Sequence, residues 1–341
     1  MQDIFFYLCK LLNYLAIVKS FKKVLISSML NRRHIRIKVM QSLYAMQQSN
    51  TDQIQSGEKF LINSIENVED LYLLMLTTLT EIRNKEEEYQ EVSQKKHLAT
   101  AEERNPNRKF IDNQVLNLLA QSTSISNKLE ERSITQWRVH DHYIQILLDE
   151  LKSSELYKNY MSSKLQSFEE DRKFVVSVFT DIIAPNEKIY EFFEDYKLTW
   201  LDDLPVVNTL IQKQLKQLKD DYSIFLVPRI FKDLDDKDFA INLYRKTILN
   251  YDELAKEYED KTPNWDVDRI AEIDTIILRM AICEMFKFSS IPVKVSINEY
   301  LEIAKEYSTP KSSIFINGIL DNISKLCQDN DKIKKIGKGL L

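Results

Sequence analysis

Glycine is scarce in this chain, and its scarcity narrows the choice of fold more than any other feature. Only four of the 341 residues are glycine, whereas average usage would be roughly 7%. Parallel α/β folds and antiparallel barrels use glycine in tight turns and phosphate-binding loops, because glycine adopts left-handed backbone conformations without steric cost. The sequence therefore favours a helical protein with few tight turns. The four glycines are Gly57, Gly318, Gly337 and Gly339.

Hydrophobic periodicity agrees with this reading, and the hydrophobic content of 44% is enough for a real core. The segment 268–288 is apolar almost all round, which is typical of a central buried helix. Asp171 and Asp236 lie near helix starts, where carboxylates cap free amides and favour the helix dipole. The fold class we expect is all-α, with helices over 31–48, 58–84, 112–131, 134–158, 168–195, 203–219, 236–260, 268–288, 293–307 and 310–328.

Two segments in the middle of the chain resemble each other at a constant offset of 65 residues. They are 171–200 and 236–265, and with one gap the match continues to Asn208-Thr209 and Asp274-Thr275. The hypothesis is that a helix pair was duplicated, and it requires the two segments to form similar helix–turn–helix units. The alternative is two amphipathic helices that share a period, but the matched aromatic and acidic positions favour duplication. Those matches are Phe174 with Phe239, Phe179 with Tyr244, Glu194-Asp195 with Glu259-Asp260, and Trp200 with Trp265.

Charge is unevenly distributed along the chain. The first 51 residues carry +7, and because the whole chain carries −5, the remainder carries −12. A basic end on an acidic body suggests a polyanion contact, although a solvated basic terminus explains the charge equally well. The apolar run 4–18 is short for a membrane span and lacks the features of a signal peptide. We expect translation to start at Met29, residues 1–28 to be a non-native or disordered extension, and the protein to have no membrane contact; the alternative is that this run is a real anchor or an additional helix.

Motifs for catalysis and for metal binding are missing from the sequence. It contains no glycine-rich phosphate loop, no G-x-S-x-G and no H-E-x-x-H. His140 and His142 are two residues apart, so a helix would point them to different faces, and they are expected to be surface residues. Three cysteines far apart fit a reducing, cytoplasmic location. We therefore expect no enzyme, no catalytic residue, no metal and no cofactor.

The segment 32–48 (RRHIRIKVMQSLYAMQQ) carries the strongest functional signal. On a helix, one stripe suits a bundle core, and a neighbouring stripe presents arginines beside an aromatic residue. Guanidinium groups bind phosphates and stack on bases, so the stripe favours RNA, although basic amphipathic helices also bind membranes or proteins. The core stripe is Ile35, Val39, Ser42, Leu43 and Met46, and the second stripe is Arg33, Arg36, Met40 and Tyr44.

Two distant segments together resemble the NusB family. RRHIRIKVMQSLY is similar to the opening R-R-x-A-R-x-x-A-L-Q-x-L-Y of that family, and DTIILRMAICEM, IPVKVSINEYLEIAKEYS and SSIFINGILDNI resemble its C-terminal half. The resemblance covers roughly 31–84 and 236–326, while 85–235 is additional, as in long NusB proteins of the Bacteroidetes type. It implies an all-α fold of two packed helical bundles with an inserted helical segment.

The resemblance also implies a function and a set of site residues. Members pair with NusE, a small-subunit ribosomal protein, bind boxA RNA, and act in the RNA polymerase antitermination complex on ribosomal RNA operons. His34 stands where many members have a further arginine, and Lys311 where the family often has an acidic residue. Together with the charge pattern, the resemblance implies RNA binding by Arg32, Arg33, His34, Arg36, Lys38 and Phe315, and NusE binding by Tyr44 and Asp274.

The expected organisation has five parts, and two other functions compete with RNA binding by an adaptor. One alternative is a structural helical scaffold for protein partners, and the other is a NusB-like domain associated with an RNA methyltransferase. Co-purification with NusE and boxA RNA would favour the adaptor, whereas other protein partners alone would favour the scaffold. The parts are the extension 1–28, N-terminal helices 29–84, a helical insertion 85–235, a C-terminal bundle 236–328, and a basic tail 329–341.

Overall fold

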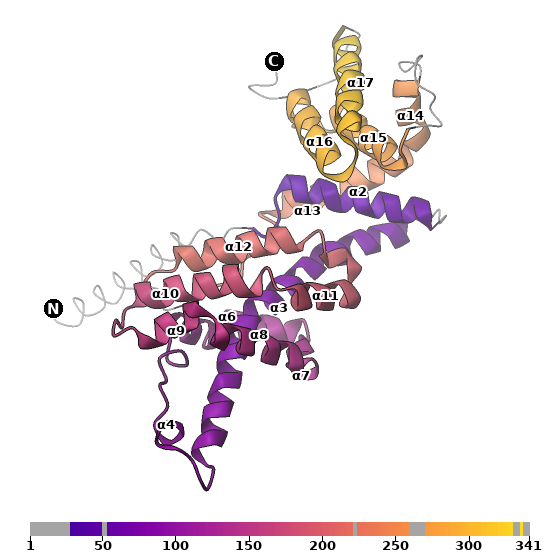
Figure 1. Ribbon diagram of the computed structural model, residues 1–341. Coiled ribbons are helices and arrows are strands. Elements are labelled where there is room, and N and C mark those ends of the chain that lie inside the picture. Colours follow the sequence, from indigo (N-terminus) through magenta and orange to yellow (C-terminus); the bar gives the residue numbers. More distant parts are fainter. Residues whose placement is uncertain (1–27, 50–52, 221–223, 260–269, 330–334, 337–341) are drawn as a thin grey trace, which may run out of the picture. The chain divides into compact units, whose positions relative to one another are not determined.

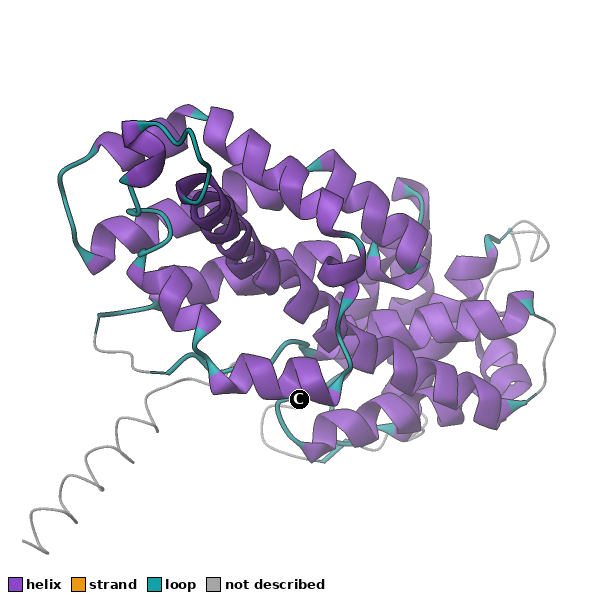
Figure 2. Ribbon diagram, turned by 90° about the horizontal axis from the view of Figure 1, so that it is seen from below, coloured by secondary structure: helices purple, strands orange, loops and turns teal. Residues whose placement is uncertain are grey.

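The computed structural model describes residues 28–49, 53–220, 224–259, 270–329 and 335–336. This described part is helical, as the purple ribbons of Figure 2 show, and its only extended pairing is an isolated parallel bridge between Ser28 and Arg229. The expected all-α fold is thereby confirmed. The chain divides into two compact units, of which unit 1 comprises Met1–Met29 and Tyr72–Arg229, and unit 2 comprises Leu30–Leu71 and Ile230–Leu341.

Among the helices of the described segments, none is long and apolar enough to cross a bilayer. The apolar run 4–18 lies outside these segments.

Unit 2 contains the arginine-rich helix and the C-terminal helices (Figure 1). Its central helix α15 packs against α2, α13, α14, α16 and α17. Ten of its residues are buried, from Asp274 to Met285, which confirms the expected central helix in 268–288. The helices are α2 (Arg32–Gln48), the start of α3 (Ile54–Gln94), α13 (Leu234–Leu249), α14 (Tyr251–Glu259), α15 (Glu272–Lys287), α16 (Val293–Tyr307) and α17 (Pro310–Asp329).

Unit 1 has a core of its own, built around the remainder of α3 and the helices that follow it. Phe110, Phe174 and Tyr160 meet there, with Tyr160 stacked on Phe174 at 3.8 Å between ring centroids. Its helices are α4 (Ala101–Arg104), α5 (Gln114–Ala120), α6 (Thr123–Glu131), α7 (Gln136–Val139), α8 (Asp141–Ser153), α9 (Glu155–Ser162), α10 (Phe168–Ser177), the π-helix η1 (Val178–Ile183), α11 (Glu187–Tyr196), the 3₁₀-helix η2 (Leu198–Trp200) and α12 (Leu204–Gln217).

The helix expected over 58–84 extends ten residues further at its C-terminal end than the sequence predicts. Helix α3 continues to Gln94, because polar residues on its last turns are buried rather than solvated. Glu86 is buried and accepts a hydrogen bond from Lys152 Nζ at 2.7 Å, and Gln90 donates to Glu86. A charged sequence with weak apolar periodicity therefore forms a helix here, because its charges are paired in the tertiary structure.

The two segments with an internal resemblance do form similar helix–turn–helix units. In unit 1, α10 and η1 run from 168 to 183 and α11 from 187 to 196; in unit 2, α13 runs from 234 to 249 and α14 from 251 to 259. At the offset of 65 residues, six buried positions of α10 and η1 coincide with the six buried positions of α13. The coincident pairs are Asp171 with Asp236, Phe174 with Phe239, Val175 with Ala240, Val178 with Leu243, Phe179 with Tyr244, and Ile182 with Thr247. Trp265 lies outside the described residues.

The two acidic residues near the helix starts are buried and serve a neighbouring helix. Asp171 accepts hydrogen bonds from Gln114 N at 2.8 Å and from the Tyr160 hydroxyl at 2.6 Å, so it caps an amide of α5. Asp236 accepts from Arg32 Nε at 2.9 Å. The expectation that these carboxylates cap their own helices misses this, because Ser167 and Asp233 cap α10 and α13 instead.

Candidate nucleic-acid interface

Helix α2 begins at a fixed point, and this fixes where its arginines emerge. The side chain of Asn31 accepts hydrogen bonds from Arg33 N at 2.9 Å and His34 N at 3.1 Å, and His34 Nδ1 accepts from Asn31 N. This reciprocal arrangement is a capping box, which satisfies amides that would otherwise have no partner. The first turn of α2 contains no acidic residue. Because cations are unfavourable at a helix N-terminus, its arginines require anions from elsewhere.

Arg32 and Arg33 obtain these anions from two different helices. Arg32 Nε donates to Asp236 of α13 at 2.9 Å, and the Arg32 guanidinium lies over the Phe239 ring at 5.1 Å. Arg33 donates from Nε and Nη2 to the two carboxylate oxygens of Glu299 on α16, at 3.0 and 2.9 Å. The hydrogen bond to Glu299 raises the pKa of Arg33, and the same bond lowers the pKa of Glu299, so both groups are charged at neutral pH.

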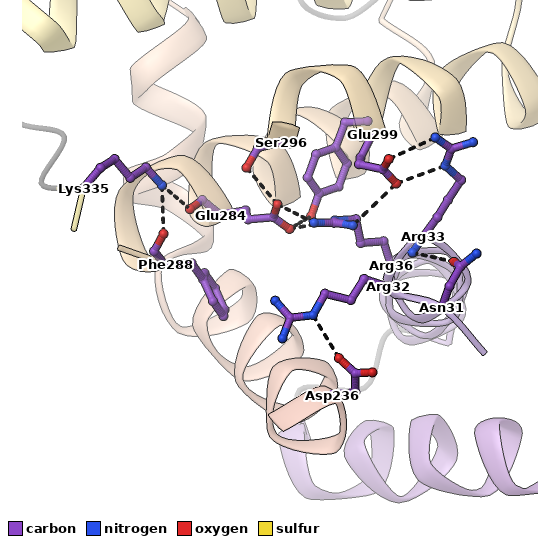
Figure 3. A network of polar contacts seen from close by, with 11 residues as sticks. Asn31, Arg32, Arg33, Arg36, Asp236, Glu284, Phe288, Ser296, Glu299 and Lys335 are labelled. Atoms are coloured by element: carbon purple, nitrogen blue, oxygen red, sulfur yellow. Dashed lines mark hydrogen bonds and ion pairs between the residues drawn. The ribbon is translucent and has the colours of Figure 1, made fainter. Parts of the chain in front are cut away.

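Arg36 is bound differently, because its side chain lies inside the unit. It is 2% exposed and donates from Nε and Nη2 to both oxygens of Glu284 at 2.8 and 2.7 Å. Glu284 is fully buried and also accepts a hydrogen bond from Ser296 Oγ at 2.7 Å (Figure 3). The Tyr300 hydroxyl donates to the same carboxylate at 3.1 Å. Burial by itself lowers the pKa of Arg36, but the hydrogen bonds and charge of Glu284 outweigh it and raise that pKa. Arg36 and Glu284 therefore form an ion pair inside the core.

The exposed sides of Arg32 and Arg33 face a cavity of about 540 Å³. Its other wall is the loop between α15 and α16 and the first turn of α16, where Ile291, Pro292 and Val295 present apolar surface. Guanidinium donors beside an apolar wall suit a nucleotide, since the donors bind phosphate and the wall contacts a base or sugar. The lining residues are Asn31, Arg32, Arg33, Arg36, Ser290, Ile291, Pro292, Val295 and Glu299.

Lys335 fixes the end of α15, from which the loop of the cavity wall starts. Its ammonium donates to the carbonyls of Phe288 at 2.8 Å and Glu284 at 3.3 Å, two carbonyls at the C-terminal end of α15 (Figure 3). The next residue, Ile336, donates its backbone N–H to Ser289 O at 3.1 Å. Burial lowers the pKa of Lys335. At least this part of the basic tail therefore has a structural contact.

Comparison with known proteins identifies relatives of this chain. A family model described as the NusB family matches residues 206–325. The transcription antitermination protein NusB of Salinibacter ruber is 43% identical over 110 residues, which is 32% of this chain and 69% of that protein. The protein of the same name from Dictyoglomus turgidum is 41% identical over 138 residues, 40% of this chain and 88% of that protein. The chain belongs to the NusB family.

A third relative shows how the likeness is limited in length. The transcription antitermination protein NusB of Chloroherpeton thalassium is 39% identical over 112 residues, 33% of this chain and 53% of that protein. No solved structure matches the chain. The matched range 206–325 starts in α12 and does not include α2, so the arginine helix belongs to the site through its contacts with α13, α15 and α16.

The boundaries between the two compact units differ from those of the expected insertion. Unit 1 begins again at Tyr72 and ends at Arg229, whereas the expected insertion was 85–235.

The structure brings together some of the residues that the NusB resemblance implies for RNA and separates others. Arg32 and Arg33 reach the cavity, whereas Arg36 touches it only as a nearly buried side chain, and Lys38 is buried at 2% exposure. The expectation that Arg36 and Lys38 present their charge at the surface therefore does not fit this structure. The reason is that α13, α15 and α16 all pack on α2, so every residue from 35 to 40 is buried. His34 is half-buried, and burial lowers its pKa, which favours the neutral ring.

Three expected site residues lie away from the residues that line the cavity. Phe315 is half-buried on α17. Tyr44 is 39% exposed on the last turns of α2. Asp274 is buried on α15, and its Oδ1 has no hydrogen-bond partner among the described residues. The carboxylates Asp236, Glu284 and Glu299 were missed as site residues, since nothing in their local sequence distinguishes them from other helical acids.

Proposed function

We propose that this NusB-family chain is a non-catalytic, RNA-binding adaptor for transcription antitermination. In this proposal it binds boxA RNA together with NusE, within the antitermination complex of RNA polymerase on ribosomal RNA operons, in the cytoplasm. The observation that carries the proposal is the cavity at the start of α2, where two partly exposed arginines face an apolar wall. The names of the relatives, which are transcription antitermination proteins, support the same function.

The two partly exposed arginines, Arg32 and Arg33, and the buried Arg36 have different roles in this proposal. Arg32 and Arg33 have side chains that are 42% and 39% exposed, so each can exchange a carboxylate for a phosphate without unfolding the helix. Arg36 holds α2 against α15 and α16 through Glu284, and thereby positions the first turn. Two or three phosphate contacts give weak, salt-dependent binding, so an adaptor of this kind depends on a partner for tight binding.

NusE is the proposed partner, and Tyr44 and Asp274 are its proposed contacts. Tyr44 offers an exposed ring, and Asp274 offers a buried carboxylate oxygen whose hydrogen-bonding capacity is unused among the described residues. A buried polar atom without a partner is costly, and a donor from a bound protein would remove that cost. The scaffold alternative requires neither RNA nor the arginines.

An anisotropy titration of labelled boxA RNA tests the proposal. The chain and its Arg33→Ala variant are compared with and without NusE. We expect NusE to increase the affinity and Arg33→Ala to decrease it, with far-UV circular dichroism unchanged. If both proteins bind with equal affinity, the arginine cavity is not the RNA site. If the chain captures NusE but neither protein binds RNA, the scaffold alternative is correct.

A further inference from the structure

The two N–H groups of Arg33 that would bind a phosphate already donate hydrogen bonds to a carboxylate. Nε and Nη2 lie on one edge of the guanidinium, and both donate to Glu299, at 3.0 and 2.9 Å (Figure 3). Carboxylates and phosphates bind to this same edge in parallel, bidentate geometry. An RNA phosphate and the Glu299 carboxylate therefore compete for the same two N–H groups.

Glu299 is not required as the neutralising charge of the core. Arg36, the buried cation nearby, has both oxygens of Glu284 as its own partner, at 2.8 and 2.7 Å. The contact between Glu299 and Arg36 Nη1 is longer, at 3.5 Å. The side chain of Glu299 is 23% exposed and lines the cavity together with Arg33, so it is accessible to an incoming ligand. Its lowered pKa keeps it ionised at neutral pH.

We propose that Glu299 is an internal competitor that occupies Arg33 until RNA displaces it. This inference rests on the proposed function, because it deepens the RNA site rather than adding another. A small anion that meets Arg33 alone gains one bidentate contact and loses an equivalent one, so its net gain is small. A strand that also meets Arg32 and the apolar wall gains contacts for which Glu299 does not compete. Glu299 thus selects a nucleic-acid strand over small anions.

A double-mutant cycle with a matched control tests the competition. The variants are Glu299→Gln, Arg33→Ala, the double variant, and Glu302→Gln. Glu302 lies one turn further along α16 and bonds Lys305, so its variant removes the same charge without freeing the donors of Arg33. RNA affinity is measured by anisotropy at one salt concentration, and folding is checked by thermal unfolding.

We expect Glu299→Gln to bind RNA more tightly by up to about five-fold, the upper end of what an exposed ion pair represents. Glu302→Gln gains less, and the gain from Glu299→Gln disappears in the Arg33→Ala background. Weaker binding by folded Glu299→Gln would overturn the inference, because Glu299 would then orient Arg33. A gain that persists without Arg33 would overturn it too, because it would reflect long-range charge alone.

A second ligand separates failure of this inference from failure of the proposed function. Tripolyphosphate binding to the same variants is followed by calorimetry. If no variant binds RNA but Glu299→Gln binds tripolyphosphate more tightly than the wild type, the proposed function fails and the competition stands. If Glu299→Gln gains no affinity for either ligand, the competition is refuted.

Discussion

The burial of the ion pair between Arg36 and Glu284 allows us to predict how much its loss changes the free energy of unfolding. The two side chains are 3% and 0% exposed, and Glu284 accepts four hydrogen bonds, two of them from Arg36. Removing one partner of such a pair leaves an uncompensated charge in the core and costs about 3–5 kcal/mol. For Glu284→Gln we expect about 3 kcal/mol, the lower end, because Glu299 lies 3.5 Å from Arg36 Nη1 and compensates in part.

The double replacement distinguishes a buried pair from two independent contacts. Arg36→Met leaves the Glu284 carboxylate buried with only Ser296 and Tyr300 as donors, so it should also cost about 3 kcal/mol. Replacing both with apolar side chains removes both charges and their desolvation penalty. We therefore expect Arg36→Met with Glu284→Leu to be more stable than either single variant, which is strong non-additivity.

Urea denaturation followed by two probes measures these changes. Far-UV circular dichroism reports on both units, whereas Trp137 and Trp200 are buried in the core of unit 1. The third tryptophan, Trp265, belongs to the sequence range of unit 2 and is replaced by phenylalanine, so that fluorescence reports on unit 1 alone. The fluorescence transition should then stay in place while the circular dichroism transition of the variants moves. Glu302→Gln is the exposed control and should leave both transitions unchanged. Additive single costs below about 1 kcal/mol would refute the buried pair.

The same double variant tests what Arg36 does. If its role is to position α2, the folded double variant should retain wild-type RNA affinity, since neither buried charge reaches the ligand. Loss of RNA binding by a protein of normal stability would show that Arg36 contacts RNA directly, as the family resemblance implies.

Three further predictions concern unit 2. Gly57→Ala should lower the free energy of unfolding in urea by about 1–3 kcal/mol, the usual cost of overpacking, because the added Cβ would lie 1.8 Å from the Tyr244 hydroxyl. Tyr244→Phe in the same protein should restore part of the loss. An unchanged stability of Gly57→Ala would contradict the close approach. Because the pKa of His34 is lowered in the folded protein, its contribution to stability is present above the unfolded pKa of about 6.5 and is lost as pH falls through the lower folded value. The variant His34→Gln keeps an acceptor for the capping box, so the midpoint of its urea denaturation should fall less on acidification than that of the wild type. Identical pH profiles of the two proteins would refute this. Burial raises the pKa of Cys283 to about 11, so iodoacetamide should label it only after unfolding, as mass spectrometry of the native and denatured protein would show.

Local patterns predicted the positions of several helices closely, but they missed the last turns of α3 and the ion pairs of the site. The periodicity of 293–307 and 310–328 matches α16 and α17 within one residue, because one face of each helix is apolar and a proline starts each of them. The carboxylates that bind the arginines lie 248 and 266 residues away along the chain, so no local pattern connects them. These ion pairs depend on the tertiary structure, which packs α15 and α16 against α2.

The stripe of arginines on α2 shows why exposure is harder to predict than helicity. Spacing placed Arg36 and Met40 on a face beside the core stripe, yet both are buried. A helix on a surface buries one face, but α2 is covered by three helices and buries nearly its whole circumference. The number of neighbours, which a single helix pattern does not contain, decided which arginine faces the solvent.

The repeated helix pair adds a contrast between the units. In unit 2 the buried Asp236 binds Arg32, which lies over Phe239; in unit 1 the equivalent Asp171 binds the Tyr160 hydroxyl, and Tyr160 stacks on Phe174. The same buried register thus holds an arginine in one unit and a tyrosine in the other. This correspondence supports the duplication that the sequence suggested.

RNA binding at the start of α2 is tested by the salt dependence of boxA RNA binding to the wild type and to Arg33→Ala in the presence of NusE. We expect tighter binding with NusE than without it, weaker binding by Arg33→Ala, and a slope of log K against log salt reduced by about 0.7 for the one lost phosphate contact. Equal affinities and equal slopes for the two proteins would contradict the claim that the start of α2 binds RNA.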